Sequence, residues 1–462
     1  MSAPSPLARR SFLKLTAFSL GSGAIGPAFQ GLLANAAIKG RSLGYGSLAP
    51  VADETTGLKL LQLPEGFRYM SFGWTGDNLA DGTPTPGAHD GMAVIAEENG
   101  IATLCRNHEL SSVRKAFGPA GITYDDNASG GCSNLQFNMR KGEWLKAWPS
   151  LSGTIKNCAG GPTPWNTWLS CEETVVEGGD SDDGETLDLH QSHGWIFEVA
   201  ADGQTQANPI KEMGRFVHEA VAVDPDTGIV YETEDRGSAG FYRFLPKTAG
   251  KLADGGRLEM LRVKGQPDLR KLGENGKTFD CEWVAIENPE KRHADESERD
   301  AAGCFSQGKA QRGTTFARLE GCWYGNGVIY FDATSGGPQG AGQIWKYDPK
   351  QEALTLVFAS PSSEVLDSPD NLAVSPRGGI ILCEDGDYVP QRLHGLTPDG
   401  NLFSFAANNI VLKGEHNGIT GDFRGQEWAG ATFSSDGKWL FVNIQTPGIT
   451  FAITGPWEDG QL

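Results

Sequence analysis

Short apolar segments recur along the chain in pairs, and each pair is joined by a turn rich in glycine, asparagine or aspartate. Such turns supply the positive-φ positions that tight β-hairpins require. An acidic or polar residue opens most pairs, an acidic cluster closes most of them, and helical segments do not alternate with them. The copies occupy residues 90–109, 161–173, 218–235, 318–337, 370–386 and 427–445.

The spacing of these copies predicts an all-β, six-bladed β-propeller. The openings at Glu219, Glu320, Asn371 and Glu427 are 101, 51 and 56 residues apart, which are close to one or two blade lengths. A four-stranded blade buries its faces only against neighbouring blades, so it must repeat around an axis. The long first interval indicates an insertion or a seemingly double-length blade around residues 245–312, and we expect this stretch to be an inserted surface excursion. Two separate β-sandwiches are the alternative, but they would not produce so regular a recurrence.

Composition supports a turn-rich, acidic protein. The 62 glycines and 25 prolines favour many tight turns, and the formal net charge of −19 disfavours nucleic-acid binding, which needs a basic surface. After the first forty residues no stretch approaches the ~20 apolar residues of a membrane span. The eight cysteines contain no CxxC pair and predict at most one or two disulfides, whose connectivity the sequence does not give; Cys281 with Cys304 or Cys322 is one candidate pair.

The N-terminus matches an export signal. Residues 9–14 read RRSFLK, and a mildly apolar stretch with a small-residue exit at residues 34–36 follows. We therefore expect a twin-arginine signal peptide over residues 1–36 and a single propeller domain over residues 37–462. The twin-arginine translocase would be its export partner, and the mature protein would be periplasmic or secreted. Because such substrates cross folded, often with a cofactor already loaded, the signal also favours a metal.

The repeat brings distant carboxylates to one place. In a propeller the innermost strands line the axial channel, so equivalent strand ends meet in a ring. Many carboxylates in one ring cannot all stay ionised without cations between them. Cys158 in the same ring would favour iron or zinc over calcium, with Cys171 as the alternative thiol. Arg318, two residues before Glu320, suits an anion such as phosphate because its planar fork donates two parallel hydrogen bonds.

Several motifs together resemble the PhoX family of secreted alkaline phosphatases. They are the twin-arginine leader, Asn107-His108-Glu109, and residues 158–173, 216–236, 316–337, 367–386 and 427–448. This resemblance implies a six-bladed propeller that holds two Fe³⁺ ions and several Ca²⁺ ions around a bridging oxide. One departure is Arg-Leu-Glu-Gly at residues 318–321, where the family has Arg-Pro-Glu-Trp. Residues 280–283 offer a second alignment of that motif but lack the arginine.

The resemblance also implies roles for particular residues. Arg318 and Glu320 would be catalytic, with Arg318 on the phosphate, and Cys158, Glu219 and Glu320 would be iron ligands. Further iron and calcium ligands would come from Glu109, Glu172, Glu173, Glu234, Asp235, Asp370, Asp385 and Glu427.

The function expected from these observations is hydrolysis of small phosphomonoesters by a metal-activated bridging oxygen or water, carried out by a monomer. Motifs of serine hydrolases, P-loop proteins and HExxH metalloproteases are absent from the sequence. Two alternatives remain. One is a calcium-dependent, lactonase-like propeller hydrolase, and the other is a secreted binding module that calcium stabilises without catalysis.

Overall fold

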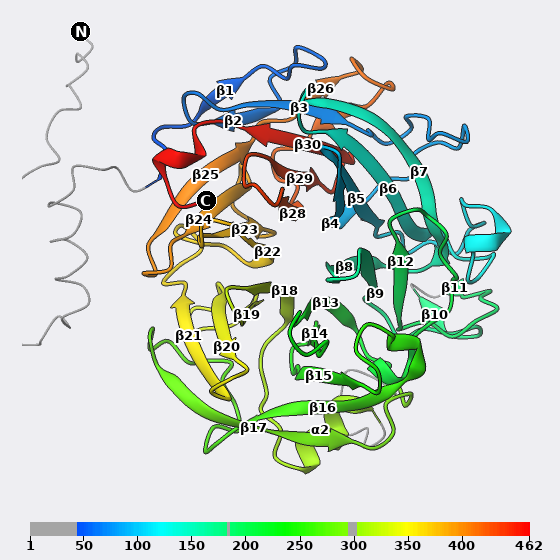
Figure 1. The fold of residues 1–462 in the computed structure, drawn as a ribbon, viewed down its shortest axis with the longest axis vertical. Coiled ribbons are helices and arrows are strands. Elements are labelled where there is room, and N and C mark those ends of the chain that lie inside the picture. The colour runs from blue at the N-terminus through cyan, green and yellow to red at the C-terminus, as the bar shows by residue number, and fades with distance from the viewer. Residues whose placement is uncertain (1–43, 183–184, 294–302) are drawn as a thin grey trace, which may run out of the picture. The chain divides into compact units, whose positions relative to one another are not determined.

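Antiparallel β-strands account for nearly all regular structure in the residues that the structure describes (Figure 1). The structure is a computed structural model, and it describes residues 44–182, 185–293 and 303–462. The predicted signal peptide, residues 1–36, lies outside the described residues. All eight cysteines are buried and free, so neither candidate pairing of Cys281, with Cys304 or with Cys322, is formed. No helix within the described ranges is long and apolar enough to cross a membrane.

The first two sheets along the chain, one of four strands and one of three, are built from strands that are close in sequence. The four-stranded sheet consists of β4 (His89–Glu98), β5 (Ile101–His108), β6 (Gly130–Asn138) and β7 (Glu143–Thr154). The three-stranded sheet consists of β8 (Asn157–Pro162), β9 (Thr167–Glu172) and β12 (Ile196–Ala200). The hairpin β10 (Ser181–Asp182) and β11 (Glu185–Thr186) lies in the connection between β9 and β12.

A nine-stranded sheet follows, in which two groups of strands are joined at their outer edges. In spatial order it contains β13 (His218–Val223), β14 (Val230–Glu234), β15 (Phe241–Pro246), β16 (Gly256–Val263), β17 (Thr278–Ile286), β21 (Ala353–Ala359), β20 (Gln343–Asp348), β19 (Val328–Ala333) and β18 (Leu319–Gly325). The helix α2 (Cys304–Ala310) precedes β18.

Two further sheets combine strands from both ends of the described chain. One contains β22 (Pro369–Val374), β23 (Ile380–Glu384), β24 (Arg392–Leu396), β25 (Leu402–Asn408), β2 (Leu61–Leu63) and β1 (Ala49–Val51). The other contains β28 (Trp428–Phe433), β29 (Leu440–Ile444), β30 (Ile449–Thr454) and β3 (Arg68–Phe72). Outside the sheets lie the hairpin β26 (Val411–Lys413) and β27 (Thr420–Asp422) and the short helices η1 (Ala120–Ile122), η2 (Lys211–Met213), η3 (Leu252–Asp254) and η4 (Trp457–Asp459).

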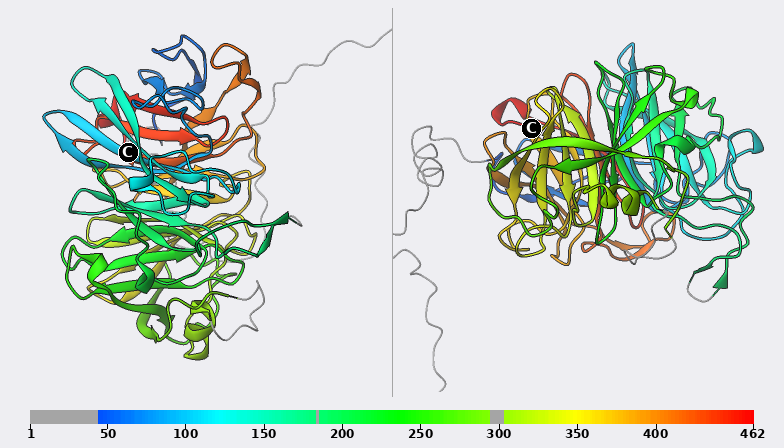
Figure 2. Two further views of the ribbon diagram at one scale, coloured as in Figure 1. Left: turned by 90° about the vertical axis from the view of Figure 1, so that its right-hand side faces the viewer. Right: turned by 90° about the horizontal axis from the view of Figure 1, so that it is seen from below.

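The first strand of each hairpin series lies on the inside of a ring. Strands β4, β8, β13, β18, β22 and β28 each contact the next in this order, and β28 contacts β4 to close the circle (Figure 1). The ribbon seen from two further sides shows the sheets stacked one after another around this circle (Figure 2). The protein therefore has an all-β, β-propeller-like fold, as the sequence predicted.

The predicted surface excursion at residues 245–312 is wrong for most of its length. Strands β16 and β17 run through it and join the two halves of the nine-stranded sheet. Their outward positions carry ion pairs, such as Arg262 with Glu282 at 2.5 Å, so the apolar alternation is interrupted by charge. The segment therefore resembled a solvated loop. Residues 294–302, which belong to the same expected excursion, lie outside the described residues.

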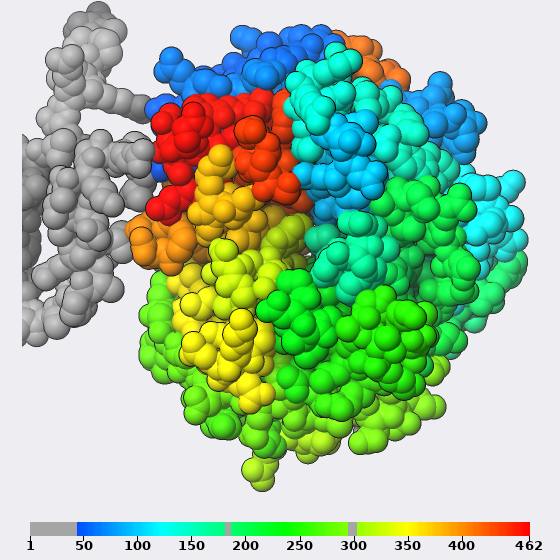
Figure 3. Space-filling view, in the orientation of Figure 1, coloured from blue at the N-terminus to red at the C-terminus, as the bar shows by residue number. Residues whose placement is uncertain are grey.

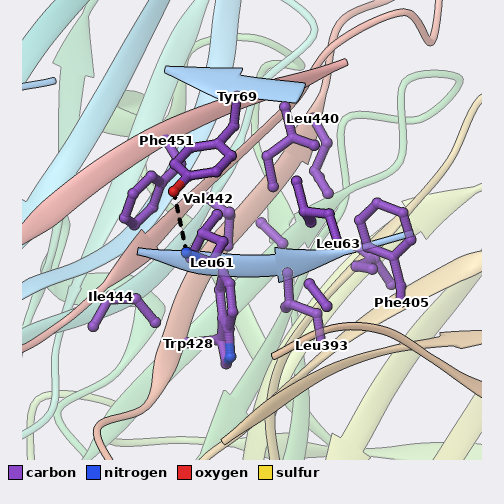
Figure 4. Packing of buried hydrophobic residues seen from close by; sticks show 14 of the residues in the cluster. Leu61, Leu63, Tyr69, Leu393, Phe405, Trp428, Leu440, Val442, Ile444 and Phe451 are labelled. Carbon is purple, nitrogen blue, oxygen red and sulfur yellow. Dashed lines mark hydrogen bonds between the residues drawn. The ribbon is translucent and has the colours of Figure 1, made fainter. Parts of the chain in front are cut away.

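An N-terminal strand completes the sheet formed by the C-terminal strands. Strand β3 pairs antiparallel with β30, and β2 pairs with β25. The space-filling view shows these early (blue) and late (red and orange) segments side by side (Figure 3). Their apolar side chains form one core that includes Leu61, Tyr69, Trp428 and Phe451 (Figure 4). The ring is thus closed by pairing between residues far apart in sequence.

Tyr69 links this closure to the strand before it. Its hydroxyl lies 2.8 Å from the amide nitrogen of Leu60 and 3.2 Å from that of Leu61, and 3.0 Å from the carbonyl oxygen of Val51 (Figure 4). The aromatic ring of Tyr69 is fully buried.

We predict that Tyr69→Phe lowers the free energy of unfolding by about 2 kcal/mol, because the buried amides of Leu60 and Leu61 and the carbonyl of Val51 lose their hydrogen-bond partner. Chemical denaturation measures this value. Tyr330→Phe, which removes a hydroxyl without a hydrogen bond in the described structure, is the control and should change stability by less than about 0.5 kcal/mol; equal effects would contradict the role of the Tyr69 hydroxyl.

Candidate functional site

Each of the six inner strands carries an irregularity near its start. The pairing register with the second strand shifts just after the first paired residues, which is the signature of a β-bulge. A bulge turns a side chain away from the regular alternation, so these residues point out of their own sheets. The residues at the shifted positions are Asp90, Cys158, Glu219, Glu320, Asp370 and, in β28, Gly430.

The second strand of each hairpin also places one side chain at this end of the sheet. It belongs to the residue that directly follows the last position paired with the inner strand. The backbone N–H of this residue donates to a carbonyl just before the neighbouring bulge, as from Glu173 to Lys156 at 2.8 Å and from Asp385 to Ser368 at 3.0 Å. The same bond recurs in all six hairpins. The residues held in this way are Glu109, Glu173, Asp235, Thr334, Asp385 and Gln445.

Most of these side chains line a cavity of about 400 Å³ between the inner strands. Glu219 and Asp235 do not line it themselves, but each is hydrogen-bonded to a residue that does, Cys158 and Arg318 respectively. The cavity wall is almost entirely polar. Two groups of potential ligand atoms, Asp90–Glu109–Cys158 and Cys158–Glu173–Glu219, each lie within 4.8 Å of one another. The Cys158 thiol donates to Glu219 Oε1 at 3.0 Å. The lining residues include Asp90, Glu109, Cys158, Glu173, Arg318, Glu320, Asp370, Asp385, Glu427 and Gln445.

The electrostatics of this cavity are dominated by burial and like charge. Burial raises the pKa of Glu219, and the nearby Glu320 and Asp370 carboxylates raise it further. The pKa of Asp90 is raised in the same way, by burial and then by Glu109. Burial and adjacent carboxylates also raise the pKa of the Cys158 thiol. The protein alone therefore disfavours full ionisation of these acids.

The same residues fit a group of cations. Asp90 Oδ1 and Glu219 Oε2 are buried without a hydrogen-bond partner among the described residues, so lone pairs that point into the protein are left unused. Carboxylate oxygens suit hard cations such as Ca²⁺, whereas a thiolate suits iron or zinc. The mixture of one thiol and many carboxylates therefore matches a site for more than one kind of metal ion.

Arg318 is the cation in the wall of the cavity. Its Nε and Nη2 donate to the two oxygens of Asp235 at 2.9 Å each, and Nη2 also donates to Glu320 Oε1 at 2.9 Å. Its Nη1 makes no hydrogen bond within the described residues. Burial alone would lower the pKa of Arg318, but Asp235 and Glu320 outweigh it and raise the pKa, so the guanidinium stays charged. Asp235 thus orients the arginine.

Two of the expected ligands do not reach the cavity. Glu172 accepts hydrogen bonds from the backbone amides of Ile155, Gly194 and Trp195 and from His193. Glu234 accepts from the Gly240 amide and the Tyr242 hydroxyl. Each is the last residue of its strand. Glu172 precedes Glu173, which lines the cavity, and Glu234 precedes Asp235, which holds Arg318. Successive strand residues point to opposite sides, so Glu172 and Glu234 point away. Cys171, the alternative thiol, is likewise buried inside a sheet core.

Sequence reasoning missed Asp90 and Gln445. Asp90 opens a copy of the repeat just as Glu219 does, so the equivalence of these positions was the available signal. Gln445 closes the last copy and donates to Glu109 Oε2 at 2.7 Å. Its position in the repeat matches that of Asp385, but an uncharged amide is a weaker sign of metal binding than a carboxylate.

A further set of residues ties three of the six bulges to the preceding hairpin. Asn107 donates to the Cys158 carbonyl at 3.1 Å, Thr233 to the Glu320 carbonyl at 2.5 Å, and Asn443 to the Asp90 carbonyl at 2.6 Å. All three occupy the same position, one residue before the end of a second strand. These bonds fix the backbone at three of the positions from which cavity side chains project.

Comparison with known proteins assigns the chain to a family. The sequence profile described as alkaline phosphatase PhoX matches residues 43–149 and 145–448. The chain belongs to the PhoX alkaline phosphatase family. No curated protein matches the chain in sequence.

Solved structures of other proteins align with this member of the PhoX family at low identity. A gluconolactonase from Xanthomonas campestris covers 90% of this chain and 100% of its own, with 11% identity and a TM-score of 0.44. The WD40 β-propeller domain of Doa1 covers 85% of this chain and 99% of its own, with 8% identity and a TM-score of 0.38.

Glu219 provides a direct test of charge crowding. We predict that Glu219→Gln raises the melting temperature of the chelator-treated protein at pH 8, by an amount equivalent to about 1–2 kcal/mol. The reason is that folding raises the pKa of Glu219, so an ionised carboxylate there opposes folding above pH 4.5, whereas an amide does not. Calorimetry measures the shift. The exposed Glu65→Gln is the control and should change little; a destabilised Glu219→Gln protein would contradict the crowding.

The raised pKa of His193 makes the stability of the protein depend on pH. It lies 2.6 Å from Glu172 Oε1 and 3.5 Å from Asp125 Oδ2. Burial alone would lower its pKa, but these two carboxylates raise it to about 9, against 6.5 when unfolded. The resulting stability is therefore present below about pH 6.5 and is lost as the pH rises through about 9.

We predict that His193→Gln removes about 2–3 kcal/mol of stability at pH 6 and much less at pH 10, measured by denaturant titration. His190→Gln, at an exposed imidazole on the neighbouring loop, is the control and should leave the pH dependence nearly intact. An unchanged pH profile in His193→Gln would exclude a protonated His193.

Proposed function

We propose that this chain is an alkaline phosphatase that hydrolyses small phosphomonoesters at a cluster of Fe³⁺ and Ca²⁺ ions. The observation that carries the proposal is the convergence of Cys158, Glu219 and Glu320, from three successive bulges, beside the guanidinium of Arg318. Membership of the PhoX family supports the reaction class. The polar lining of the cavity supports a small, charged substrate.

We further propose that the ring is a six-bladed propeller with the metal site in its axial channel. Six inner strands with six bulges at equivalent positions support this count. In this arrangement the nine-stranded sheet is two blades fused through β17.

The ligands divide by chemistry. Cys158, Glu219 and Glu320 would hold the iron, because only this part of the cavity offers a thiol. Calcium would be held by oxygen donors alone, from Asp90, Glu109, Glu173, Asp370, Asp385 and Glu427. A nearby cation would also deprotonate the Cys158 thiol, whose pKa is otherwise raised. Asp235 would act through Arg318, and Glu172 and Glu234 would be structural.

The residues of the chain bind and orient the ester. Bound cations would supply the positive charge that neutralises the phosphoryl oxygens and lowers the pKa of the attacking oxygen species. Arg318 would donate from Nη1 to a phosphate oxygen while its other nitrogens stay on Asp235 and Glu320. Because Asp235 fixes the plane of the guanidinium, this donor is oriented before the substrate arrives. Glu320 would serve both as a ligand and as the group that holds the edge of Arg318.

Export through the twin-arginine translocase to the periplasm or the exterior is part of the proposal, and we propose that the mature protein is a monomer. The motif at residues 9–14 supports the export route. Folding before export would allow iron to be loaded at the cavity before translocation.

Purified, metal-loaded protein should hydrolyse p-nitrophenyl phosphate, and elemental analysis should find both iron and calcium.

We predict that Arg318→Lys lowers kcat/KM by about 100-fold, because the ammonium group of lysine, unlike the planar guanidinium, cannot donate to Asp235 and phosphate in the same plane. Cys158→Ser should lose iron and activity. Cys171→Ala, at the buried thiol outside the cavity, should keep both. Full activity in metal-free protein, or turnover of lactones but of no phosphate ester, would refute the phosphatase proposal.

A further inference from the structure

A second cavity, of about 710 Å³, lies beside the candidate site. Its walls come from four connections at one end of the nine-stranded sheet. They are the residues after β14, between β16 and β17, before β18, and after β19. Residues that line it include Gly237, Gln266, Arg270, Lys271, Ala317 and Ser335.

This cavity opens at the same end of the strands as the candidate site. Glu173, Asp235 and Asp385 follow the ends of second strands, and Gly237 and Ser335 lie in connections of the same kind. The two cavities also share a wall, because the segments 235–239 and 316–318 are hydrogen-bonded to each other, with the Arg318 amide 2.8 Å from the Arg236 carbonyl. Ala317 lines the second cavity and Arg318 lines the first. A group extending from a phosphate at Arg318 would therefore find this space next to it.

The charges around the second cavity differ from those of the first. Its one carboxylate, Asp268, is held by both Nε and Nη2 of Arg270, at 3.1 and 2.7 Å. Arg270 is further tied to the Ser238 hydroxyl at 3.0 Å, which fixes it against the shared wall. The remaining charge in the wall is therefore the ammonium group of Lys271.

Lys271 is exposed, and its side chain reaches from its own connection to the one that follows β19. Its Nζ lies 3.9 Å from the position that a Cβ on Gly340 would take. Within the described residues neither its ammonium group, the Gln266 amide nor the Ser335 hydroxyl makes a side-chain hydrogen bond or ion pair. Three hydrogen-bonding groups, one of them cationic, are thus available to a ligand in a protein whose net charge is −19.

We propose that the second cavity binds the leaving group of the substrate, and that this leaving group carries its own negative charge, such as a carboxylate or a second phosphate. The inference rests on the proposed phosphatase function and adds a substrate class to it. The volume is of the size that holds small organic ligands. The cation and the two polar groups would pair with the distal anion, while the phosphate is held at Arg318.

Two esters with nearly identical alcohols test this proposal. 3-Phosphoglycerate and glycerol 3-phosphate differ only in that a carboxylate replaces a hydroxymethyl group. With metal-loaded protein we expect kcat/KM to favour 3-phosphoglycerate by about five- to tenfold, as one partly solvated charge pair allows. The preference should appear in KM, because the distal anion is bound equally before and during reaction.

Variants of Lys271 decide whether this residue is responsible. Lys271→Gln should lower kcat/KM for 3-phosphoglycerate about fivefold more than for glycerol 3-phosphate, and Lys271→Glu should reverse the preference. Lys251→Gln makes the same change of charge in the exposed connection between β15 and β16, at the opposite end of the sheet, and should leave both values unchanged. Equal kcat/KM for the two esters, or a preference that survives Lys271→Gln, would overturn the anionic subsite alone. Turnover of neither ester would overturn the phosphatase function and the subsite together.

Discussion

Repulsion between buried carboxylates is the constraint around which this structure is arranged. Burial raises the pKa of Glu219, Glu320 and Asp370, and neighbouring carboxylates raise each of them further: Glu320 and Asp370 act on Glu219, Asp235 and Asp370 act on Glu320, and Asp385 acts on Asp370. The pKa of Asp90 is raised in the same way, by burial and then by Glu109. Side chains in this situation would separate if the backbone allowed it. The fold has to hold them together, and the cations that we propose would offset the repulsion that the fold alone cannot remove.

Three features of the backbone resist that separation. The bulges turn one side chain of each inner strand toward the cavity, and the bonds from second strands, as from Glu173 to Lys156, fix where each bulge begins. Asn107 and Asn443 then tie bulge carbonyls to the preceding sheet. All of these depend on a closed circle, which β3 completes by pairing with β30. A core around Tyr69, distant from the cavity along the sheet, therefore contributes to the geometry of the site.

The sequence predicted the fold class and most of the cavity because both follow from repetition. Glu219 and Glu320 were found because each opens an apolar strand at the same place in its copy. Glu172 and Glu173 could not be separated, since both acids end the same strand and only the three-dimensional structure shows which one faces the cavity. Strand β16 was missed because Arg257 and Glu259 pair on its outer face and make the segment look solvated. Local charge thus hid a strand whose partners are far away in sequence.

The ring is not symmetric, and the position that breaks the symmetry explains how the cavity keeps room for a ligand. At the bulge of β28 the residue is Gly430, with φ at 61°, and a Cβ there would lie 2.5 Å from the Asp90 carbonyl. This close approach between β28 and β4 requires glycine, so the last strand cannot place a carboxylate where the other five inner strands place an acid or a thiol. Glu427 and Gln445 reach the cavity from outside the strand ends instead. The contact that closes the circle therefore also removes one side chain from the ring, and the acids that remain surround a space rather than fill it.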